Sequence, residues 1–301
     1  MRAFLGRVLA AIAIVWVVCV PASADTIVDI DFGSLGDLIG DADGLDDGDR
    51  IRDVSGNGYH GFWGATPGDI PVIAGPDGGP VIDTRASSGK VFLRDGLNGI
   101  PASWDGATTT GTPYFTLKGD ESYTFEAIVN FGSSAAGSSG TNGLMGFTGG
   151  NEVWWRVQDG IMGFTFDDGP NRISVSSSDF NFSAAFDGDY HNLALTYDAS
   201  VSGERTITGY LDGVAIGNLV DTTGVPTGTM YDGTNDFYVG AYNTSSSNYF
   251  NGLQDHYRIS SGVLAPGDFL PVPVPEPGFG PLALTGLAAL GWGWRWRRQS
   301  A

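Results

Sequence analysis

Short runs of alternating apolar and polar residues dominate this sequence, and glycine, aspartate, asparagine and serine separate them. Residues 26–32 place Val28, Ile30 and Phe32 on one side, and residues 122–131 place five apolar side chains on one side. A period of two predicts strands, because successive side chains of a strand point to opposite faces. With 47 glycines in the chain, the pattern predicts an all-β fold, an antiparallel β-sandwich.

The rest of the central region follows the same pattern. Further strands are predicted at residues 153–157, 160–166, 191–197, 207–211, 214–216, 236–241 and 254–260. Asp212 and Gly213 separate two apolar runs, which predicts a two-residue hairpin turn. Residues 37–60 and 132–143 are predicted to be loops. The absence of a regular sequence repeat argues against a propeller or a solenoid.

The N-terminal residues have the order of a signal peptide. Arg2 and Arg7 precede an uncharged apolar run at residues 8–20, and a small-x-small site with Ala22 and Ala24 follows. This layout predicts cleavage before Asp25, because the apolar run is short for a membrane span. The alternative is an anchor that is never cleaved.

The C-terminal residues form a second membrane-seeking segment. Prolines alternate through residues 271–277, and an apolar run at 279–294 leads to Arg295, Arg297 and Arg298. Alternating prolines exclude a helix and predict an extended spacer. Sixteen helical residues reach about 24 Å, which is marginal against a hydrocarbon core of about 30 Å. The arginines predict that the C-terminus stays inside and that the domain lies outside.

A short motif makes this tail more specific. The residues Val274, Pro275, Glu276 and Pro277, with the apolar helix and arginines behind them, resemble the PEP-CTERM sorting signal over about residues 272–301. The resemblance implies export in a Gram-negative bacterium and recognition, with removal of the tail, by an exosortase-type membrane enzyme. An ordinary anchor that is never cut is the alternative.

The charges are unevenly distributed along the chain. All 34 acidic residues lie within residues 25–277, whereas five of the 15 basic residues lie in the two ends. Such an acidic surface disfavours binding to nucleic acid and attracts divalent cations. The only cysteine, Cys19, lies in the predicted signal peptide, so no disulfide is expected in the mature chain. We expect a signal peptide at 1–24, one domain at 25–270 and the sorting tail at 271–301.

Five segments of the central domain resemble laminin-G-like, concanavalin-type jelly rolls. They are the DVSGNG turn at 53–58, the strand at 123–127, the strand at 189–197, the YLDG hairpin at 210–213 and the closing strand at 251–259. The resemblance implies a jelly-roll β-sandwich and admits both lectins and glycosidases. Two departures are His256, where an acidic residue is common, and a long insertion at about 92–118.

The carboxylates do not form a glycosidase pattern. Glycosidases of this fold carry two glutamates on one strand face in an E-x-D-x-x-E pattern, which is absent here. Glu121 and Glu126 are separated by an odd number of residues and would point to opposite faces. Glu126 is expected at the solvent face or the rim. His60, His191 and His256 lie far apart in the sequence and are expected to be hydrogen-bonded strand residues. No catalytic residue is predicted.

An acidic, glycine-rich stretch is the candidate cation site. Calcium prefers six to eight oxygen ligands in flexible loops. The stretch departs from the EF-hand template at Leu45, so a solvated acidic loop is the alternative. The tentative calcium ligands are Asp29, Asp31, Asp41, Asp43, Asp46 and Asp49.

Exposed aromatic side chains could stack on sugar rings. Trp63, Trp154 and Trp155 are the tentative ligand-binding residues. Because Trp154 and Trp155 are adjacent, a strand would direct one of them inward and the other outward.

These observations predict an exported, non-catalytic protein of the cell envelope or extracellular matrix that binds carbohydrate. Its expected partners are an exosortase-type enzyme, an extracellular polysaccharide or surface protein, and the membrane through its tail, but not nucleic acid. A structural or adhesive matrix protein is the alternative, and a glycoside hydrolase is the third hypothesis.

Overall fold

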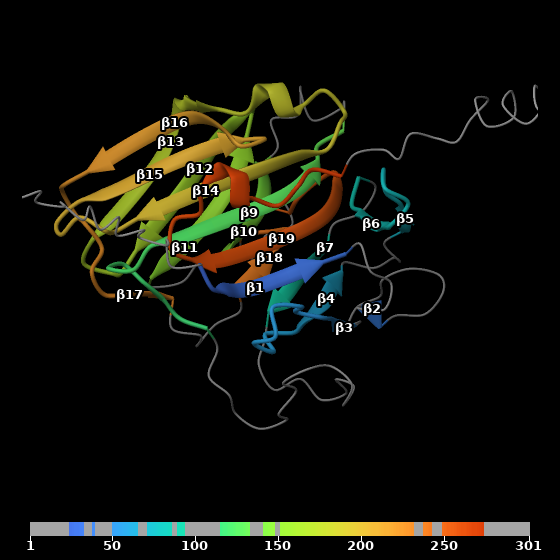
Figure 1. Ribbon diagram of the computed structural model, residues 1–301, viewed down its shortest axis with the longest axis horizontal. Coiled ribbons are helices and arrows are strands. Elements are labelled where there is room, and N and C mark those ends of the chain that lie inside the picture. The colour runs from blue at the N-terminus through green and yellow to red at the C-terminus, as the bar shows by residue number, and fades with distance from the viewer. Residues whose placement is uncertain are drawn as a thin grey trace, which may run out of the picture.

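The computed structural model describes residues 24–32, 38–39, 50–65, 71–85, 89–93, 115–132, 141–147, 151–231, 237–242 and 249–273. Two stacked antiparallel sheets form most of it (Figure 1). The predicted signal peptide up to Ser23 and the sorting tail from Val274 lie outside these residues. No helix in the described part of the chain is long and apolar enough to span a membrane.

The first sheet, called sheet I, has the order β16-β15-β14-β9-β19-β6-β5, with β1 also paired to β19. Its strands are β1 (Thr26–Asp31), β5 (Val72–Ala74), β6 (Pro80–Asp83), β9 (Tyr123–Asn130), β14 (His191–Asp198), β15 (Arg205–Leu211), β16 (Val214–Asp221) and β19 (Leu253–Ser261). The first and last strands of the domain are therefore neighbours.

The second sheet, called sheet II, has the order β13-β12-β11-β10-β18-β7-β4-β3-β2. Its strands are β2 (Leu38–Ile39), β3 (Arg50–Ile51), β4 (Gly61–Ala65), β7 (Gly89–Leu93), β10 (Thr141–Phe147), β11 (Glu152–Gln158), β12 (Ile161–Asp167), β13 (Arg172–Asn181) and β18 (Phe237–Val239). A small third sheet pairs β8 (Leu117–Lys118) with β17 (Thr229–Tyr231). Two short 3-10 helices, η3 (Ser183–Ala185) and η5 (Pro266–Asp268), complete the described elements.

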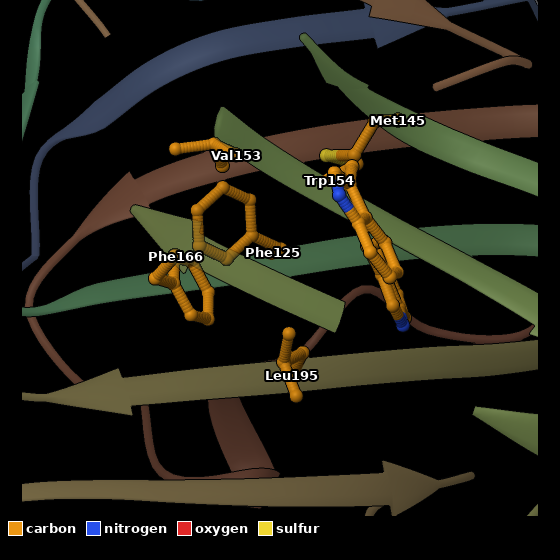
Figure 2. Close-up of a pocket in the computed structure, with 7 residues that line it drawn as sticks. Phe125, Met145, Val153, Trp154, Phe166 and Leu195 are labelled. Carbon is orange, nitrogen blue, oxygen red and sulfur yellow. The ribbon is translucent and has the colours of Figure 1, made fainter. Parts of the chain in front are cut away.

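The core lies between the two large sheets and is strongly aromatic. Phe125 and Leu195 from sheet I meet Val153, Trp155 and Phe166 from sheet II, and the space among them leaves no room for a water molecule (Figure 2). Aromatic rings at such contacts add attraction beyond the burial of their area. The predicted inward faces of 26–32 and 122–131 are confirmed, because Val28, Phe32, Tyr123 and Phe131 and their partners on these faces are buried.

Strand β9 is buried on both faces, which an alternating pattern does not predict. Residues 262–270, here called the C-terminal strap, cross the outer face of sheet I and cover two outward residues of β9, Thr124 and Glu126. The main-chain N–H of Leu264 donates to Thr124 Oγ1 at 2.9 Å, and the N–H of Leu270 donates to Glu126 Oε1 at 2.6 Å. The strap therefore covers the part of this outer face that lies over β9.

The hairpin prediction is confirmed and the loop predictions are partly wrong. Asp212 and Gly213 both have positive φ angles, 50° and 76°, as a two-residue turn between β15 and β16 requires. The predicted loop at 37–60 contains the short strands β2 and β3, and the predicted loop at 132–143 ends where β10 begins at Thr141. The strands β2 and β3 have only two residues each, too few to show the alternation that marks a strand in the sequence.

Candidate functional site

Trp154 and Trp155 point to opposite faces of β11. Trp155 is 2% exposed and belongs to the core, whereas Trp154 is half-buried on the outer face of sheet II. The alternation of β11 requires this division, because Val153, Trp155 and Val157 all face the core. Including Trp155 among the ligand-binding residues was therefore wrong. Trp63 lies in β4, but its side chain is outside the described part of the structure.

A stacked cluster surrounds Trp154 on the outer face of sheet II, and we call Trp154, Arg156 and Tyr242 the platform. The rings of Trp154 and Tyr242 have centroids 5.4 Å apart and are inclined by 36°. The guanidinium carbon of Arg156 lies 4.8 Å from the Trp154 ring centroid and 5.5 Å from that of Tyr242. Arg156 Nη1 also donates a hydrogen bond to the Tyr242 hydroxyl at 3.1 Å. Each side chain therefore holds the others in place.

The glycine at position 163, which has no side chain, makes room for this cluster. Gly163 on β12 pairs with Arg156 on β11. A Cβ atom at Gly163 would lie 3.1 Å from Arg156 Nε and 3.5 Å from Cζ3 of Trp154. The glycine thus lets both side chains lie close to the sheet, and cation–π contacts of this kind contribute on the order of 1 kcal/mol.

Polar side chains continue the outer face beyond the platform. Trp154 pairs with Thr165, which in turn pairs with Ser174, and the Thr165 hydroxyl donates to Ser174 Oγ at 2.8 Å. Two residues earlier on β11 and β13, Arg172 Nη2 lies 3.2 Å from a carboxylate oxygen of Glu152. Thr165 is fully buried, so the groups that the face presents beside the aromatic surface are the exposed Ser174 and the pair of Glu152 and Arg172. An aromatic surface beside hydroxyl and charged groups can stack on a sugar ring and bind its hydroxyls.

The sequence identified Trp154 and missed its two partners. Arg156 was accessible to sequence reasoning, because a residue two positions along a strand shares its face. Tyr242 follows β18 and lies 86 positions from Arg156 in the sequence, so only the fold brings the two together.

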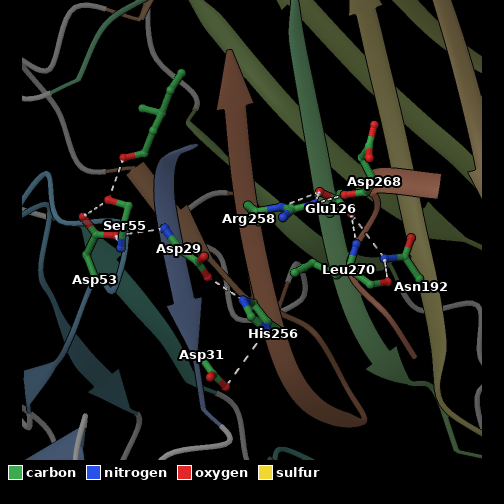
Figure 3. Close-up of polar contacts among 11 residues, drawn as sticks. Asp29, Asp31, Asp53, Ser55, Glu126, Asn192, His256, Arg258, Asp268 and Leu270 are labelled. Atoms are coloured by element: carbon green, nitrogen blue, oxygen red, sulfur yellow. Dashed lines mark hydrogen bonds and ion pairs between the residues drawn. The ribbon is translucent and has the colours of Figure 1, made fainter. Parts of the chain in front are cut away.

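The tentative calcium ligands Asp29 and Asp31 face a histidine. Asp29 Oδ1 is hydrogen-bonded to His256 Nε2, and Asp31 Oδ1 lies 4.0 Å from His256 Nδ1 (Figure 3). Burial lowers the pKa of His256, but these two carboxylates and Asp255 outweigh it and raise the pKa above the ordinary value. Protonated His256 therefore joins β19 to β1.

The described residues give little support for a metal centre. Within them, no group of three or more histidine, aspartate or glutamate side chains is arranged to hold a metal ion. The other tentative calcium ligands, Asp41, Asp43, Asp46 and Asp49, lie outside the described ranges. Calcium binding by that stretch stays a prediction.

The DVSGNG turn has a structural role in this chain. The buried Asp53 carboxylate accepts hydrogen bonds from the N–H of Asp29 and from the N–H and Oγ of Ser55, at 2.8–3.0 Å (Figure 3). It also accepts the N–H of Tyr59 at 3.0 Å. The Nδ1 atom of His60 accepts the N–H of Asp53 at 3.0 Å. These bonds fasten the turn to β1. They occupy the acceptor positions of the Asp53 carboxylate, so calcium could bind to it only if some of them broke.

The prediction that Glu126 lies at the solvent face or rim is wrong. Glu126 is fully buried, and its carboxylate accepts hydrogen bonds from Arg258 Nε and the N–H of Leu270, both at 2.6 Å (Figure 3). Asn192 Nδ2 approaches the same carboxylate at 3.4 Å. Glu126 points away from the core, as its position in β9 requires, but the C-terminal strap covers it. Its partners give it a structural role.

His191 confirms the expectation of a hydrogen-bonded strand histidine. Its Nδ1 lies 2.7 Å from Asp212 Oδ2 and its Nε2 lies 3.0 Å from Asp187 Oδ1. Burial lowers the pKa of His191, but the two carboxylates raise it above the ordinary value. His191 therefore ties the β15–β16 turn to the loop before β14.

The predicted start of the mature chain is bound to β19. The N–H of Asp25 donates to Ser261 Oγ at 3.0 Å, and the N–H of Ser261 donates to the Asp25 carbonyl at 2.8 Å. Of the predicted cleavage residues, Ala24 and Asp25 are described and Ala22 is not. The sorting-motif residues Val274, Pro275, Glu276, Pro277, Arg295, Arg297 and Arg298 lie outside the described ranges.

Solved structures with a similar arrangement of strands are distant in sequence. The binding domain of Paraclostridial Mosquitocidal Protein 1 aligns with a TM-score of 0.49 and 13% identity, over 81% of this chain and 50% of that chain. The receptor binding domain of botulinum neurotoxin D aligns with a TM-score of 0.46 and 11% identity, over 81% and 51%. The chain thus spans about half the length of the solved structures that it matches.

The family is assigned from the amino-acid sequence of the domain described above. No curated protein matches the chain. A model of the concanavalin A-like lectin/glucanases superfamily matches residues 103–268, which include strands from both sheets and most of the C-terminal strap. Because this match covers more than half of the sequence, the chain belongs to the concanavalin A-like lectin/glucanase superfamily.

Proposed function

We propose that the protein is an exported, non-catalytic carbohydrate-binding protein of the cell envelope or extracellular matrix. The platform on the outer face of sheet II is the observation that carries this proposal. Its three side chains come from β11 and from the segment after β18, and mutual contacts at 4.8–5.5 Å fix their positions. A binding surface that is ordered before the ligand arrives loses less entropy on binding.

The chemistry of the platform suits a sugar. The apolar face of a pyranose ring packs on an aromatic ring, and Trp154 offers the larger half-buried ring. Arg156 supplies hydrogen-bond donors beside it, and the exposed hydroxyl of Ser174 lies two strands away on the same face. We assign Trp154 the stacking contact and Arg156 the hydroxyl contacts.

The proposal of a non-catalytic role rests on the partners of three of the four glutamates in residues 25–270. Glu126 is occupied by Arg258 and the C-terminal strap, Glu121 is hydrogen-bonded to Lys118 and Tyr123, and Glu152 is paired with Arg172. A glycosidase needs one carboxylic acid and one carboxylate on either side of the bond that it cleaves. Carboxylates that are already held in hydrogen bonds or ion pairs favour a protein that binds carbohydrate over one that cleaves it.

The two chain ends support the localisation. The signal-peptide pattern at 1–24 and the VPEP motif at 274–277 favour export, transient membrane attachment through the tail and processing by an exosortase-type enzyme. Intact-mass measurement of the protein from its host tests this part. Masses that begin at Asp25 and lack the arginine cluster are expected, and a mass that retains both ends would refute it.

A glycan array tests the binding function, with the purified protein applied once with calcium and once with chelator. Trp154→Ala is expected to weaken binding roughly tenfold, on the order of 1.4 kcal/mol. Tyr210→Ala is the control, because it removes an aromatic ring from the outer face of the other sheet, where Tyr210 packs on Phe269. Loss of binding in chelator would favour the acidic stretch as a calcium site.

Absence of glycan binding under both conditions would overturn the proposal. The structural or adhesive matrix protein would then be the better description. Equal binding by the parent protein and Trp154→Ala would leave carbohydrate binding in place but remove the platform as its site.

A further inference from the structure

A polar groove lies where β1 begins, and none of its lining residues belongs to the platform. Its volume is about 640 Å³, and its lining includes Asp25, Thr26, Ser55, Asn57, Tyr59 and Ser261. Volumes of about 300–1,000 Å³ are typical of small-molecule sites. The groove is formed by three segments far apart in the sequence: the start of β1, the DVSGNG turn and the end of β19.

Hydrogen bonds hold the walls of this groove in position. Asn57 Nδ2 donates to the carbonyls of Thr26 and Ile27 at 2.8 and 2.9 Å. Ser55 Oγ contacts the carbonyl of Ile27 at 3.2 Å. On the opposite wall, Asp25 and Ser261 are joined by the main-chain bond and the Ser261 hydroxyl described above. The side chains of Ser55, Asn57 and Ser261 are therefore held in position before a ligand binds.

One acceptor in the groove is uncommitted. Asp25 is exposed, and within the described ranges its carboxylate makes no hydrogen bond. Tyr59 lies on the same groove, and its ring is fixed by an edge contact to Phe115 with centroids 5.3 Å apart. A free carboxylate beside a fixed aromatic ring can accept hydrogen bonds from a pair of sugar hydroxyls while the ring contacts the apolar face of the sugar.

The charge of the groove selects among ligands. Among the described residues that line the groove there is no lysine, arginine or histidine, and Asp25 supplies a negative charge. An anionic ligand would meet repulsion from the Asp25 carboxylate in the uncleaved chain, and from the acidic chain as a whole in both forms. Cleavage before Asp25, which the sequence predicts, would add an α-ammonium group next to the carboxylate and balance its charge. A neutral, hydroxyl-rich ligand fits both forms.

We propose that this groove is a second saccharide subsite, one that binds a neutral hexose unit of a polysaccharide through Asp25 and Tyr59. The proposal rests on the proposed carbohydrate-binding function and adds a site with its own residues and ligand class. Two subsites on one domain would let a single protein bind two segments of polysaccharide, which raises the apparent affinity for a polymer above that for a short oligosaccharide.

The test measures binding of neutral hexose hexasaccharides (gluco-, manno- and galacto-) and of a polyuronate hexamer to the purified protein by calorimetry. Asp25→Asn keeps the size of the side chain and the main-chain bonds of residue 25, and it is expected to weaken binding of a neutral hexamer about tenfold. Tyr59→Leu, which removes the ring, is the second variant and is expected to weaken binding similarly. Asp189→Asn removes an exposed carboxylate outside the groove and should leave binding unchanged.

Trp154→Ala is measured in parallel to separate this proposal from the platform. Loss of affinity in Trp154→Ala with none in Asp25→Asn and Tyr59→Leu would overturn the groove and retain the platform. Loss in the groove variants alone would support the groove and overturn the platform. Stronger binding of the polyuronate than of every neutral hexamer would overturn the groove, and failure of the parent protein to bind any of these probes would overturn both.

Discussion

Glu126 and Arg258 form a buried ion pair on the outer face of sheet I. Arg258 Nε and Nη2 both lie close to Glu126 Oε2, at 2.6 and 2.5 Å, while Glu126 Oε1 accepts the N–H of Leu270. Glu126 comes from β9, Arg258 from β19 and Leu270 from the C-terminal strap. One carboxylate therefore joins two neighbouring strands to the segment that covers them (Figure 3).

Glu126→Ala is predicted to destabilise the domain. Removing one partner of a buried pair leaves the other charge uncompensated, at a cost of about 3 kcal/mol. Glu126→Gln retains an acceptor for the Leu270 N–H and should cost less, on the order of 1–2 kcal/mol. Urea unfolding of each variant measures the change in free energy.

Glu204→Gln is the control for this pair of variants, because Glu204 is only partly buried and its side chain is not bound in the strap. It should change the free energy of unfolding by less than about 0.5 kcal/mol. Equal stability of Glu126→Ala and the parent protein would show that the strap does not depend on this carboxylate.

Asp53→Ala is predicted to release the DVSGNG turn from β1. The substitution leaves the N–H groups of Asp29, Ser55 and Tyr59 without their acceptor. Unsatisfied buried donors cost about 1–3 kcal/mol each, so a loss of at least about 2 kcal/mol is expected. Hydrogen exchange measures it locally, through faster exchange of the Asp29 and Tyr59 amides. Val54→Ala, at the exposed neighbouring position, should leave both rates unchanged.

Trp155→Ala and Trp154→Ala are predicted to have opposite consequences. Trp155 is in the core, so its truncation should cost about 3–5 kcal/mol of stability. Trp154 is on the outer face, so its truncation should cost less stability and reduce glycan affinity. Thermal unfolding and the glycan array, applied to both variants, separate the two roles. Comparable destabilisation by the two substitutions would contradict the assignment of faces.

Asp255 is predicted to make the domain less stable as the pH rises. Burial of its carboxyl, with the charges of Asp31 and Asp77 added and that of His256 opposing, raises the pKa to about 6 from an ordinary 3.8. Because the pKa of Asp255 is raised in the folded state, its full contribution to the free energy of unfolding is present at pH values below its pKa in the unfolded chain. That contribution is lost as the pH rises through about 6. Asp255→Asn cannot ionise and should escape this loss.

The stability difference between Asp255→Asn and the parent protein is the quantity to measure. It should shift in favour of the variant by about 2 kcal/mol between pH 4 and pH 8, from urea unfolding at each pH. Carboxyls whose pKa is lowered, such as that of Asp168 with its backbone donors, change the stability of both proteins equally, so their effect cancels in the difference. A difference that stays constant with pH would show that Asp255 is not protonated preferentially in the folded state.

Elements governed by local physics were predictable from the sequence. The alternation of residues 26–32 and 122–131 fixed which side chains face the core, because the period of a strand is two. Asp212 and Gly213 specified their turn, since few residues adopt the positive φ angles that it needs. The opposite orientations of Trp154 and Trp155 followed from adjacency alone.

Only the tertiary structure decided what covers each outer face. Glu126 reads as a solvent-facing residue, yet it is buried because a strap more than 130 positions later in the chain crosses its strand. Asp29 and Asp31 read as calcium ligands, yet His256 from the last strand lies against them. Tyr242 completes the platform from a segment with no local signal. A sequence pattern reports the period of one strand, whereas the burial and charge of its outward side chains depend on the distant segments that pack on them.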